Sequence, residues 1–518
     1  MTQKNLIKST GIVIVITIIS KIFGLLRDAT IASTFGATLS TDAYTMSMTI
    51  PDLLFGVIGA AIATTFIPAL SESYKNGGRK DMYEFANSII NLLFIMSIVI
   101  FIFGWIYAPS IVHIIAPKFI GEKYNLTVEL TRLSVLNILF MSTTAGYISM
   151  LHTLNKFTAS TLTGFVVSIP IIIYNLLGAK SGIYGLVIVT LIGFGLQIFI
   201  QIPCLLKNGY KYRFKININD SRIKKMLTLI IPVLIGTGVN QINTLVDRIM
   251  ASGLPDGSIV SMDFAIKIST LVYGTFALPI ITVIYPTLSI DGTSKDFESF
   301  KAHISKAINN INLIMIPSAV GLMILRSTVI SVIFKHGAFD NSAVSMTSIP
   351  LLYLVFGMVF YGIRDVCNRS FYALKDTKTP MINGILGLCT CIGMNIIMVP
   401  IMGIGGLAIS NVSAAIVSST LLIINLRRKL GGINEKEILD SGSRIIVSSI
   451  IMGLAIYVVS KSLAYLGTNF KGNSIILICS ISIGAGVYFI MLSLLNVKEY
   501  KIIVGITKRK IKTIINLG

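Results

Sequence analysis

Long uninterrupted apolar runs constrain this chain more than any other feature of its sequence. Many extend over about 20 residues or more, the length that an α-helix needs to cross the hydrocarbon core of a bilayer. They lack the period-two alternation of membrane-spanning strands, so helices are favoured over a barrel. Of 518 residues 54% are hydrophobic and only 13% are charged, whereas a soluble domain needs a largely polar surface. We therefore expect an all-α polytopic membrane protein.

Windows of about 19 residues, bounded by turn and charge signals, predict about fourteen transmembrane helices. They are expected near residues 6–35, 44–71, 85–108, 128–151, 157–177, 182–205, 226–252, 262–289, 306–325, 344–371, 380–400, 405–426, 444–465 and 473–496. The segment 326–343 is too short to cross and is predicted to be an interfacial turn. The first run is too long for the apolar part of a signal peptide, so no cleavable signal is expected.

Basic residues gather in alternate connections between the expected spans. The basic connections are those at 75–80, 156, 207–225, 295–306, 375–378 and 427–436. The opposite set is poor in basic residues, so the positive-inside rule predicts that the first set and both termini are cytoplasmic. The net charge of +21 then reflects topology and contact with anionic membrane lipids. No nucleic-acid-binding module accompanies it, and nucleic acid is not expected as a partner.

An internal repeat is visible without gaps. The stretch 53–71, "LLFGVIGAAIATTFIPALS", aligns with 271–289, "LVYGTFALPIITVIYPTLS", with glycine, proline and serine in phase. Six spans separate the copies, so they share an orientation, and we expect two six-helix lobes in a parallel pseudo-repeat. The alternative is chance similarity between apolar helices. The expected divisions are an N-terminal lobe at 1–220, a C-terminal lobe at 221–430, and two extra helices with a basic tail at 431–518.

Charged side chains within the first expected span need a polar place to face. Lys21 and Asp28 share one helical stripe, and Arg27 widens it. A charge at the centre of a lipid-facing helix costs about 2.5 to 3.5 kcal/mol on insertion scales, which favours a cleft between the lobes. The second lobe contributes Lys267 and the first also contributes Asp42. A cleft with cationic walls indicates an anionic ligand.

Structural alternatives stand beside this interpretation. Arg27 and Asp28 could form an ion pair that holds helices together, and Lys21 could extend to the membrane interface. Asp247 could simply pair with Arg248. Six other polar residues of the spans could form hydrogen bonds between helices, or lie at the membrane interface, and have no role in the cleft. They are Asn240, Gln241, Asn243, Arg364, Asp365 and Arg369.

Motifs of soluble enzymes are missing from the sequence. It contains no GxxxxGK[ST] and no HExxH. The four histidines are scattered, and the five cysteines form no CxxC pair. We expect a transporter without covalent chemistry or a cofactor, in which ion gradients, the membrane potential or the gradient of the substrate supplies the energy.

Four stretches carry a family resemblance: "SKIFGLLRDATIASTFGATLSTDAYTMSMTIPDLL", "VDRIMASGLPDGSIVSMDFAIK", "VIFKHGAFDNSAVSMTS" and "FYALKDTKTP". They resemble the MurJ family of lipid II flippases of peptidoglycan synthesis, within the exporter superfamily that also holds the MATE drug exporters. The resemblance runs from about residue 8 to 425. It implies a cargo of undecaprenyl-pyrophosphate-linked disaccharide pentapeptide (lipid II), moved from the inner to the outer leaflet of the bacterial cytoplasmic membrane by alternating access. It also implies that the protein acts as a monomer.

The resemblance assigns substrate-binding residues by position. Arg27 and Asp28 match the family's RD pair, and Asp42 matches its TDA aspartate. Lys21 and Lys267 stand where the family usually has arginines, and a lysine keeps the charge but loses the bidentate fork.

One departure follows the motif "PDLL". Many members then have two arginines and, a turn later, a glutamate, whereas this chain has Phe55, Gly56 and Ala60. Losing both signs of charge together suggests that a salt-bridged gate is absent or replaced. It leaves room for a related lipid-linked sugar as cargo.

The resemblance further implies a cation site in the second lobe. Asp247 stands at the position of the carboxylate ligand of that cation site. The positions of the other two ligands are occupied by Asn395 and Asn411. One carboxylate with amide oxygens can still hold Na⁺. The last two spans would form a groove for the lipid tail, or else an added packing pair. The alternatives to a lipid II flippase are a flippase for another undecaprenyl-linked oligosaccharide or a sporulation relative, then a cation-coupled multidrug exporter, and last a membrane scaffold.

Overall fold

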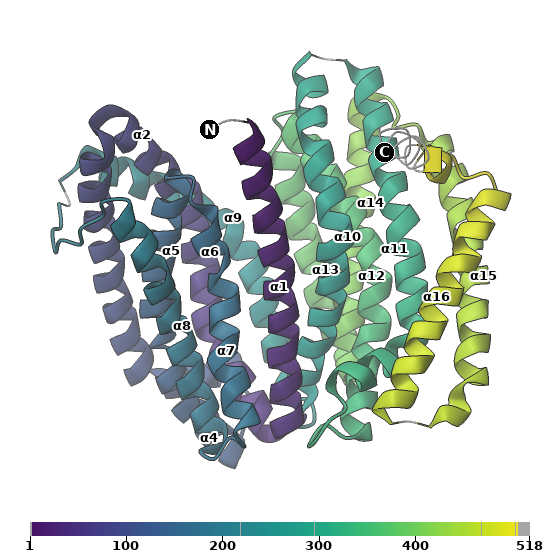
Figure 1. The fold of residues 1–518 in the computed structure, drawn as a ribbon, viewed down its shortest axis with the longest axis horizontal. Coiled ribbons are helices and arrows are strands. Elements are labelled where there is room, and N and C mark those ends of the chain that lie inside the picture. Colours follow the sequence, from purple (N-terminus) through teal and green to yellow (C-terminus); the bar gives the residue numbers. More distant parts are fainter. Residues whose placement is uncertain (1–2, 218, 295, 468, 503, 506–518) are drawn as a thin grey trace, which may run out of the picture. The chain divides into compact units, whose positions relative to one another are not determined.

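The computed structural model describes residues 3–217, 219–294, 296–467, 469–502 and 504–505, and the regular structure of these ranges is helical throughout (Figure 1). The helices are α1 (Gln3–Phe35), α2 (Leu39–Ile106), α3 (Ala108–Ile115), α4 (Gly121–Ser134), α5 (Asn137–Thr153), α6 (Phe157–Thr161), α7 (Thr163–Leu176), α8 (Gly182–Lys207), α9 (Ser221–Ala251), α10 (Ser258–Ser294), α11 (Phe297–Phe334), α12 (Asn341–Ala373), α13 (Lys378–Met402), α14 (Ile404–Leu430), α15 (Glu435–Ser462), the 3₁₀ turn η1 (Ala464–Leu466) and α16 (Phe470–Leu494).

The all-helical polytopic class is confirmed. Within the described residues, 11 helical stretches are long and apolar enough to cross a membrane. The spans expected from the sequence are largely helical, because an apolar segment in lipid must satisfy its own backbone hydrogen bonds. Two of them are each divided between two helices: the span at 128–151 between α4 and α5, and the span at 157–177 between α6 and α7. The spans at 44–71 and 85–108 share α2, which kinks at Gly78, where φ is 71°.

The prediction of an interfacial turn over 326–343 is wrong for its first half. Helix α11 continues to Phe334, and only residues 335–340 separate it from α12. The reason is that the apolar period of α11 runs on: the side chains of Ile330 and Phe334 are fully buried. Arg326 therefore lies inside a helix.

The chain forms two compact units. The first comprises Met1–Val260 with His336–Asp340, and the second comprises Ser261–Lys335 with Asn341–Gly518. Helix α9 thus belongs to the first unit, together with the short turn before α12. The lobe boundaries at 220 and 430 remain a prediction.

The core of the first unit is built around α2. Phe66 and Phe85, on either side of its kink, are almost completely buried and pack with residues of α5, α8 and α9. Gly146 of α5 lets that helix approach α2 closely, because a Cβ at this position would lie 2.7 Å from Ile90 Cγ1. Small residues at such contacts allow close packing of membrane helices, where no hydrophobic effect drives association.

In the second unit, α15 and α16 pack against α11. Ile445, Met452 and Tyr488 are buried in their shared core. A Cβ at Gly484 of α16 would lie 2.6 Å from Ile456 Cγ1 of α15, so glycine sets the spacing of this helix pair. The last two spans therefore form a tightly packed pair, whereas their role as a groove for a lipid tail stays a prediction.

Helices α5 and α12 end in turns of the same kind. Helix α5 ends in a left-handed residue, Asn155 at φ 57°, and α12 ends 220 positions later in the same way, at Lys375 with φ 59°. In both turns the next residue's N–H donates to the carbonyl oxygen five residues earlier, at 2.8 Å in the first and 2.9 Å in the second. Helix α16 ends in the same turn, with Asn496 at φ 55° and the Val497 N–H donating to the Leu492 carbonyl oxygen at 3.1 Å, so this is a general helix ending and the internal repeat stays a prediction.

Candidate functional site

Arg27 and Asp28 are brought together on α1. The Nε and Nη2 groups of Arg27 both donate to Asp28 Oδ1, at 3.1 and 3.0 Å. The arginine side chain is 26% exposed and that of the aspartate 5%. A guanidinium has five N–H donors, so this contact leaves three for another acceptor. The ion pair and anion binding, which the sequence presents as alternatives, are therefore compatible.

The two lysines of the predicted substrate site lie on different units. Lys21 is exposed on α1, six residues before Arg27. Lys267 is half-buried on α10 in the second unit, with its Nζ 5.6 Å from the centre of the Phe264 ring. Their binding of substrate stays a prediction.

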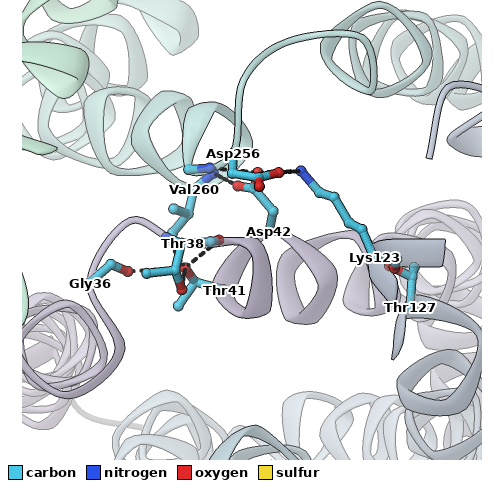
Figure 2. A network of polar contacts seen from close by, with 9 residues as sticks. Gly36, Thr38, Thr41, Asp42, Lys123, Thr127, Asp256 and Val260 are labelled. Carbon is cyan, nitrogen blue, oxygen red and sulfur yellow. Dashed lines mark hydrogen bonds and ion pairs between the residues drawn. The ribbon is translucent and has the colours of Figure 1, made fainter. Parts of the chain in front are cut away.

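Asp42 lies in the first turn of α2 and is completely buried. Figure 2 shows its carboxylate among three donors. Oδ2 accepts from Lys123 Nζ at 2.9 Å and from the Gly257 N–H at 2.8 Å, and Oδ1 accepts from the Val260 N–H at 3.0 Å. Gly257 and Val260 flank the start of α10 at Ser258, so Asp42 caps the N-terminus of that helix from a different helix. We call Asp42, Lys123, Asp256, Gly257 and Val260 the Asp42 network.

The start of α2 holds Asp42 in place. Thr38 and Thr41 form a capping box, in which the Thr38 N–H donates to Thr41 Oγ1 at 2.8 Å. Thr41 Oγ1 also donates to the Gly36 carbonyl oxygen at 3.0 Å. Local hydrogen bonds therefore fix the turn from α1 into α2, independently of the contacts that Asp42 makes with distant residues.

Lys123 is the network residue that the sequence analysis missed. It projects from α4, donates to Asp42 and to Asp256 Oδ1 at 2.8 Å, and lies 4.4 Å from the centre of the Phe119 ring. Its side chain is only 10% exposed. A signal was present, because Lys123 stands in a connection of the set expected to be poor in basic residues. Backbone N–H donors such as those of residues 257 and 260 carry no such signal.

Three connections meet around this network. Gly257 adopts φ +85°, and a Cβ there would lie 2.4 Å from the Ala37 carbonyl oxygen, so the α9–α10 loop touches the α1–α2 turn. From the third connection, 335–340, the Ala338 N–H donates to the Ser33 carbonyl oxygen at 2.8 Å. Gly337, at φ +54°, is equally close to Ser33. The first two loops, around 37–41 and 253–258, are therefore in contact.

At the departure after "PDLL", α9 packs against α2. A Cβ at Gly56 of α2 would meet the Gln241 side-chain nitrogen of α9, the far end of a flexible side chain, which would have to shift to admit an arginine at position 56. Phe55 packs beside the core of α2. The side chains of Ala60 and Asn240 lie outside the described part of the chain.

The residues predicted to hold a cation are divided between the units. Asp247 lies on α9 of the first unit. Asn395 is fully buried on α13 with its Nδ2 3.7 Å from Cys391 Sγ, and Asn411 of α14 donates to the Leu407 carbonyl oxygen at 3.1 Å. Helices α13 and α14 pack together closely. Among the described residues no group of three or more His, Cys, Asp or Glu could hold a metal ion, and the carboxylate–amide site stays a prediction.

Sequence comparisons connect this arrangement with known proteins. Residues 31–475 match the family described as "Lipid II flippase MurJ". A "Lipid II flippase MurJ" of Thermosipho africanus is 30% identical over 479 residues, which cover 92% of this chain and 94% of that protein. A "Probable lipid II flippase MurJ" of Vibrio cholerae serotype O1 is 26% identical over 510 residues, covering 96% and 97%.

Structural comparisons agree in fold. A solved lipid II flippase MurJ in an inward closed conformation superposes with a TM-score of 0.79 at 29% identity, and covers 93% of this chain and 98% of that one. An inward-facing MATE family multidrug transporter superposes with a TM-score of 0.66 at 13% identity, over 82% of this chain and 98% of its own. The second likeness concerns the fold alone.

Proposed function

Because the chain belongs to the MurJ family of lipid II flippases, we propose that it carries lipid II from the inner to the outer leaflet of the bacterial cytoplasmic membrane. It is a multi-pass membrane transporter and not an enzyme. The geometry of Arg27 carries the proposal for this chain. Arg27 lies on α1, within the first span expected from the sequence, is hydrogen-bonded to Asp28, and keeps donors for an anion.

The chemistry of the cargo fits this arginine. A pyrophosphate offers several anionic oxygens, and a guanidinium can donate two parallel hydrogen bonds to such a group. Asp28 occupies the Nε edge of Arg27 and so fixes the direction of the remaining N–H groups. Lys21 and Lys267 would add positive charge without that directional constraint.

Alternating access gives the Asp42 network its role in this proposal. The network joins the α1–α2 turn to the N-terminus of α10, and the loops around it are in contact. Release of cargo at the end of the protein where the Asp42 network lies would require the hydrogen bonds from the Gly257 and Val260 N–H groups to the Asp42 carboxylate to break. Network formation and rupture would then mark two states of one transport cycle.

Orientation follows from the charge distribution. Within the first unit, the start of α2 and the basic connection 208–217 lie at opposite ends of the helices (Figure 1). With the positive-inside rule, the basic end and both termini face the cytoplasm, and the Asp42 network faces outward. We propose further that the protein works as a monomer and draws on Na⁺ or the membrane potential, with Asp247, Asn395 and Asn411 as the cation ligands.

Depletion of the protein from a cell that depends on it tests the proposal. Lipid II exposed on the outer face is measured while a dye efflux assay runs in parallel. Loss of lipid II exposure with unchanged efflux is expected. Loss of efflux with unchanged exposure would identify a drug exporter, and accumulation of a different undecaprenyl-linked sugar inside the cell would identify another cargo.

A further inference from the structure

The connection between α8 and α9 has an unusual construction. Helix α8 ends at Lys207, residues 208–209 form a turn, and residues 210–217 then run beside α2 without regular secondary structure (Figure 1). Gly209 turns the chain at φ +88°. A plain linker needs only the length to reach the next helix, and it usually leaves its backbone to water. This segment is instead held along its length by side chains of α2.

Two asparagines of α2, one turn apart, bind the backbone of the segment. Asn87 Nδ2 donates to the Lys211 carbonyl oxygen at 3.1 Å. Asn91 Nδ2 donates to the carbonyl oxygens of Arg213 and Lys215, at 3.0 and 3.1 Å. Both asparagines are buried, so these hydrogen bonds replace water and are expensive to lose.

Two tyrosines of the segment complete the asparagine hydrogen bonds. Tyr210 Oη donates to Asn87 Oδ1 at 2.6 Å, and Tyr212 Oη donates to Asn91 Oδ1 at 2.7 Å. The Tyr210 ring also packs against Tyr83 of α2, with ring centres 5.4 Å apart. The alternating tyrosines thus attach the segment to α2. The one residue between them, Lys211, is exposed.

A cavity of about 430 Å³ lies between the segment and the kinked part of α2. Its wall includes four basic side chains: Arg79, Lys80, Lys211 and Arg213. The one carboxylate in the wall, Glu84, lies 3.4 Å from Lys215 and is thereby partly neutralised. In the part of the chain that the structure describes, none of the four basic residues forms an ion pair. Four like charges around one cavity repel each other and favour an anion between them.

The neighbours of the cavity indicate where that anion comes from. Tyr212 and Phe214 are 55% and 70% exposed, and aromatic side chains of this kind prefer the level of the lipid headgroups. The basic end of the unit faces the cytoplasm under the positive-inside rule, where anionic lipids attract lysine and arginine. A phosphodiester accepts charge-assisted hydrogen bonds from such residues.

We propose that Arg79, Lys80, Lys211 and Arg213 form a binding site for the headgroup of an anionic phospholipid of the inner leaflet. The ladder of asparagines and tyrosines holds the site ready before the lipid arrives, which reduces the entropy lost on binding. The site lies within the first unit and needs no cargo, so it does not depend on the proposed transport function.

The test compares two double variants of the full-length protein in lipid nanodiscs. Binding of phosphatidylglycerol is measured by native mass spectrometry and by titration of a fluorescent phosphatidylglycerol. Lys211→Gln with Arg213→Gln removes two charges from the cavity wall. The control, Lys224→Gln with Lys225→Gln, removes two exposed charges of the nearby start of α9 that do not line the cavity. One basic residue near an anionic surface contributes about five-fold, so the first pair should weaken binding about 30-fold and the control less than about three-fold.

Further measurements separate the remaining outcomes. Asn91→Ala, which leaves every charge in place, should also weaken binding because it releases the segment. Lys80→Gln on the surface of α2 is the second wall variant if the first pair fails to purify as a monodisperse protein. Equal loss in the wall and control variants would show an effect of net charge alone and overturn the site. Competition by inorganic phosphate or glycerol 3-phosphate as strong as that by the lipid would overturn the headgroup as its ligand.

Discussion

Lys123 offers a test in which distance and burial predict different results. Its Nζ lies 2.9 Å from Asp42 and 2.8 Å from Asp256, so the two ion pairs are equal in length. The Asp42 side chain is 0% exposed, whereas that of Asp256 is 56% exposed. If proximity decided stability, removal of either carboxylate charge would cost the same. If burial decides, the Asp42 pair should dominate.

The magnitudes follow from the partners that each change leaves behind. Lys123→Met leaves a buried carboxylate, and removing one partner of a buried ion pair costs about 3 to 5 kcal/mol. Asp42 retains two backbone N–H donors, so we expect the lower end, a loss of about 3 kcal/mol in free energy of unfolding. Asp256→Asn removes an exposed charge and should cost at most about 0.5 kcal/mol.

Denaturant unfolding in detergent micelles, followed by far-ultraviolet circular dichroism, measures both variants. The double variant Lys123→Met with Asp256→Asn should unfold within about 0.5 kcal/mol of Lys123→Met alone, because the exposed pair is already broken. Glu122→Gln, the exposed neighbour of Lys123 on α4, is the matched control and should leave stability unchanged. Lys123→Met breaks both ion pairs and Asp256→Asn only one, so equal pairs would make the first loss about twice the second. A Lys123→Met loss no larger than twice the Asp256→Asn loss would therefore refute the view that burial, and not distance, sets the strength of this network.

Four further expectations concern transport and packing. Arg27→Ala should abolish lipid II exposure while membrane levels of the protein stay near normal, because it removes a ligand contact and opens no core. Lys267→Arg should retain activity and Lys267→Glu should lose it in the same assay, since positive charge is the role assigned to it. Gly56→Arg should lower the midpoint of thermal unfolding, because its Cβ already meets a side chain of α9. Cysteines at Ser40 and Ser258, in a background without the five native cysteines, should form a disulfide that stops transport until it is reduced, with neighbouring positions tried in parallel.

Each of these has a contrary result. Disappearance of the Arg27→Ala protein from the membrane would make its ion pair structural. Equal activity of all three forms at position 267 would remove that residue from the site. A stable and active Gly56→Arg protein would show that α2 and α9 separate readily. Crosslinked protein that transports at the full rate would rule out separation of these two loops as a step of the cycle.

The helices could be predicted because lipid imposes simple rules. An apolar segment of sufficient length must be helical, whatever its neighbours are, so the expected spans are largely helical. The error over 326–343 arose at the end of an expected span, because the segment is too short to cross the membrane by itself. A helix can continue past one charged residue when the following turn, here with Ile330 and Phe334, is buried against other helices.

Contacts between distant segments were harder to predict. The match of 53–71 with 271–289 predicts two copies of one helix, but it does not reveal helix-ending turns such as those at Asn155 and Lys375, which depend on backbone angles. The ladder at 208–217 escaped notice for a related reason. Its asparagines bind main-chain carbonyl oxygens. Every residue type has such an oxygen, so the sequence carries no signal for these hydrogen bonds.

Arg27 and Asp42 show how a structure distinguishes charges that the sequence groups together. Both are charged side chains in or beside the first two spans, and both match motif positions of the family. The Asp42 carboxylate, with about four acceptor sites, already receives three donors from its own chain. Arg27, with five donors, gives two to Asp28. A side chain whose hydrogen bonds are nearly complete within the protein is suited to holding a conformation, because ligand binding would have to displace existing partners. A side chain with donors left over can bind an anion without breaking anything. By this criterion we propose that Arg27 serves the cargo site and that Asp42 holds the contact between the α1–α2 turn and the start of α10.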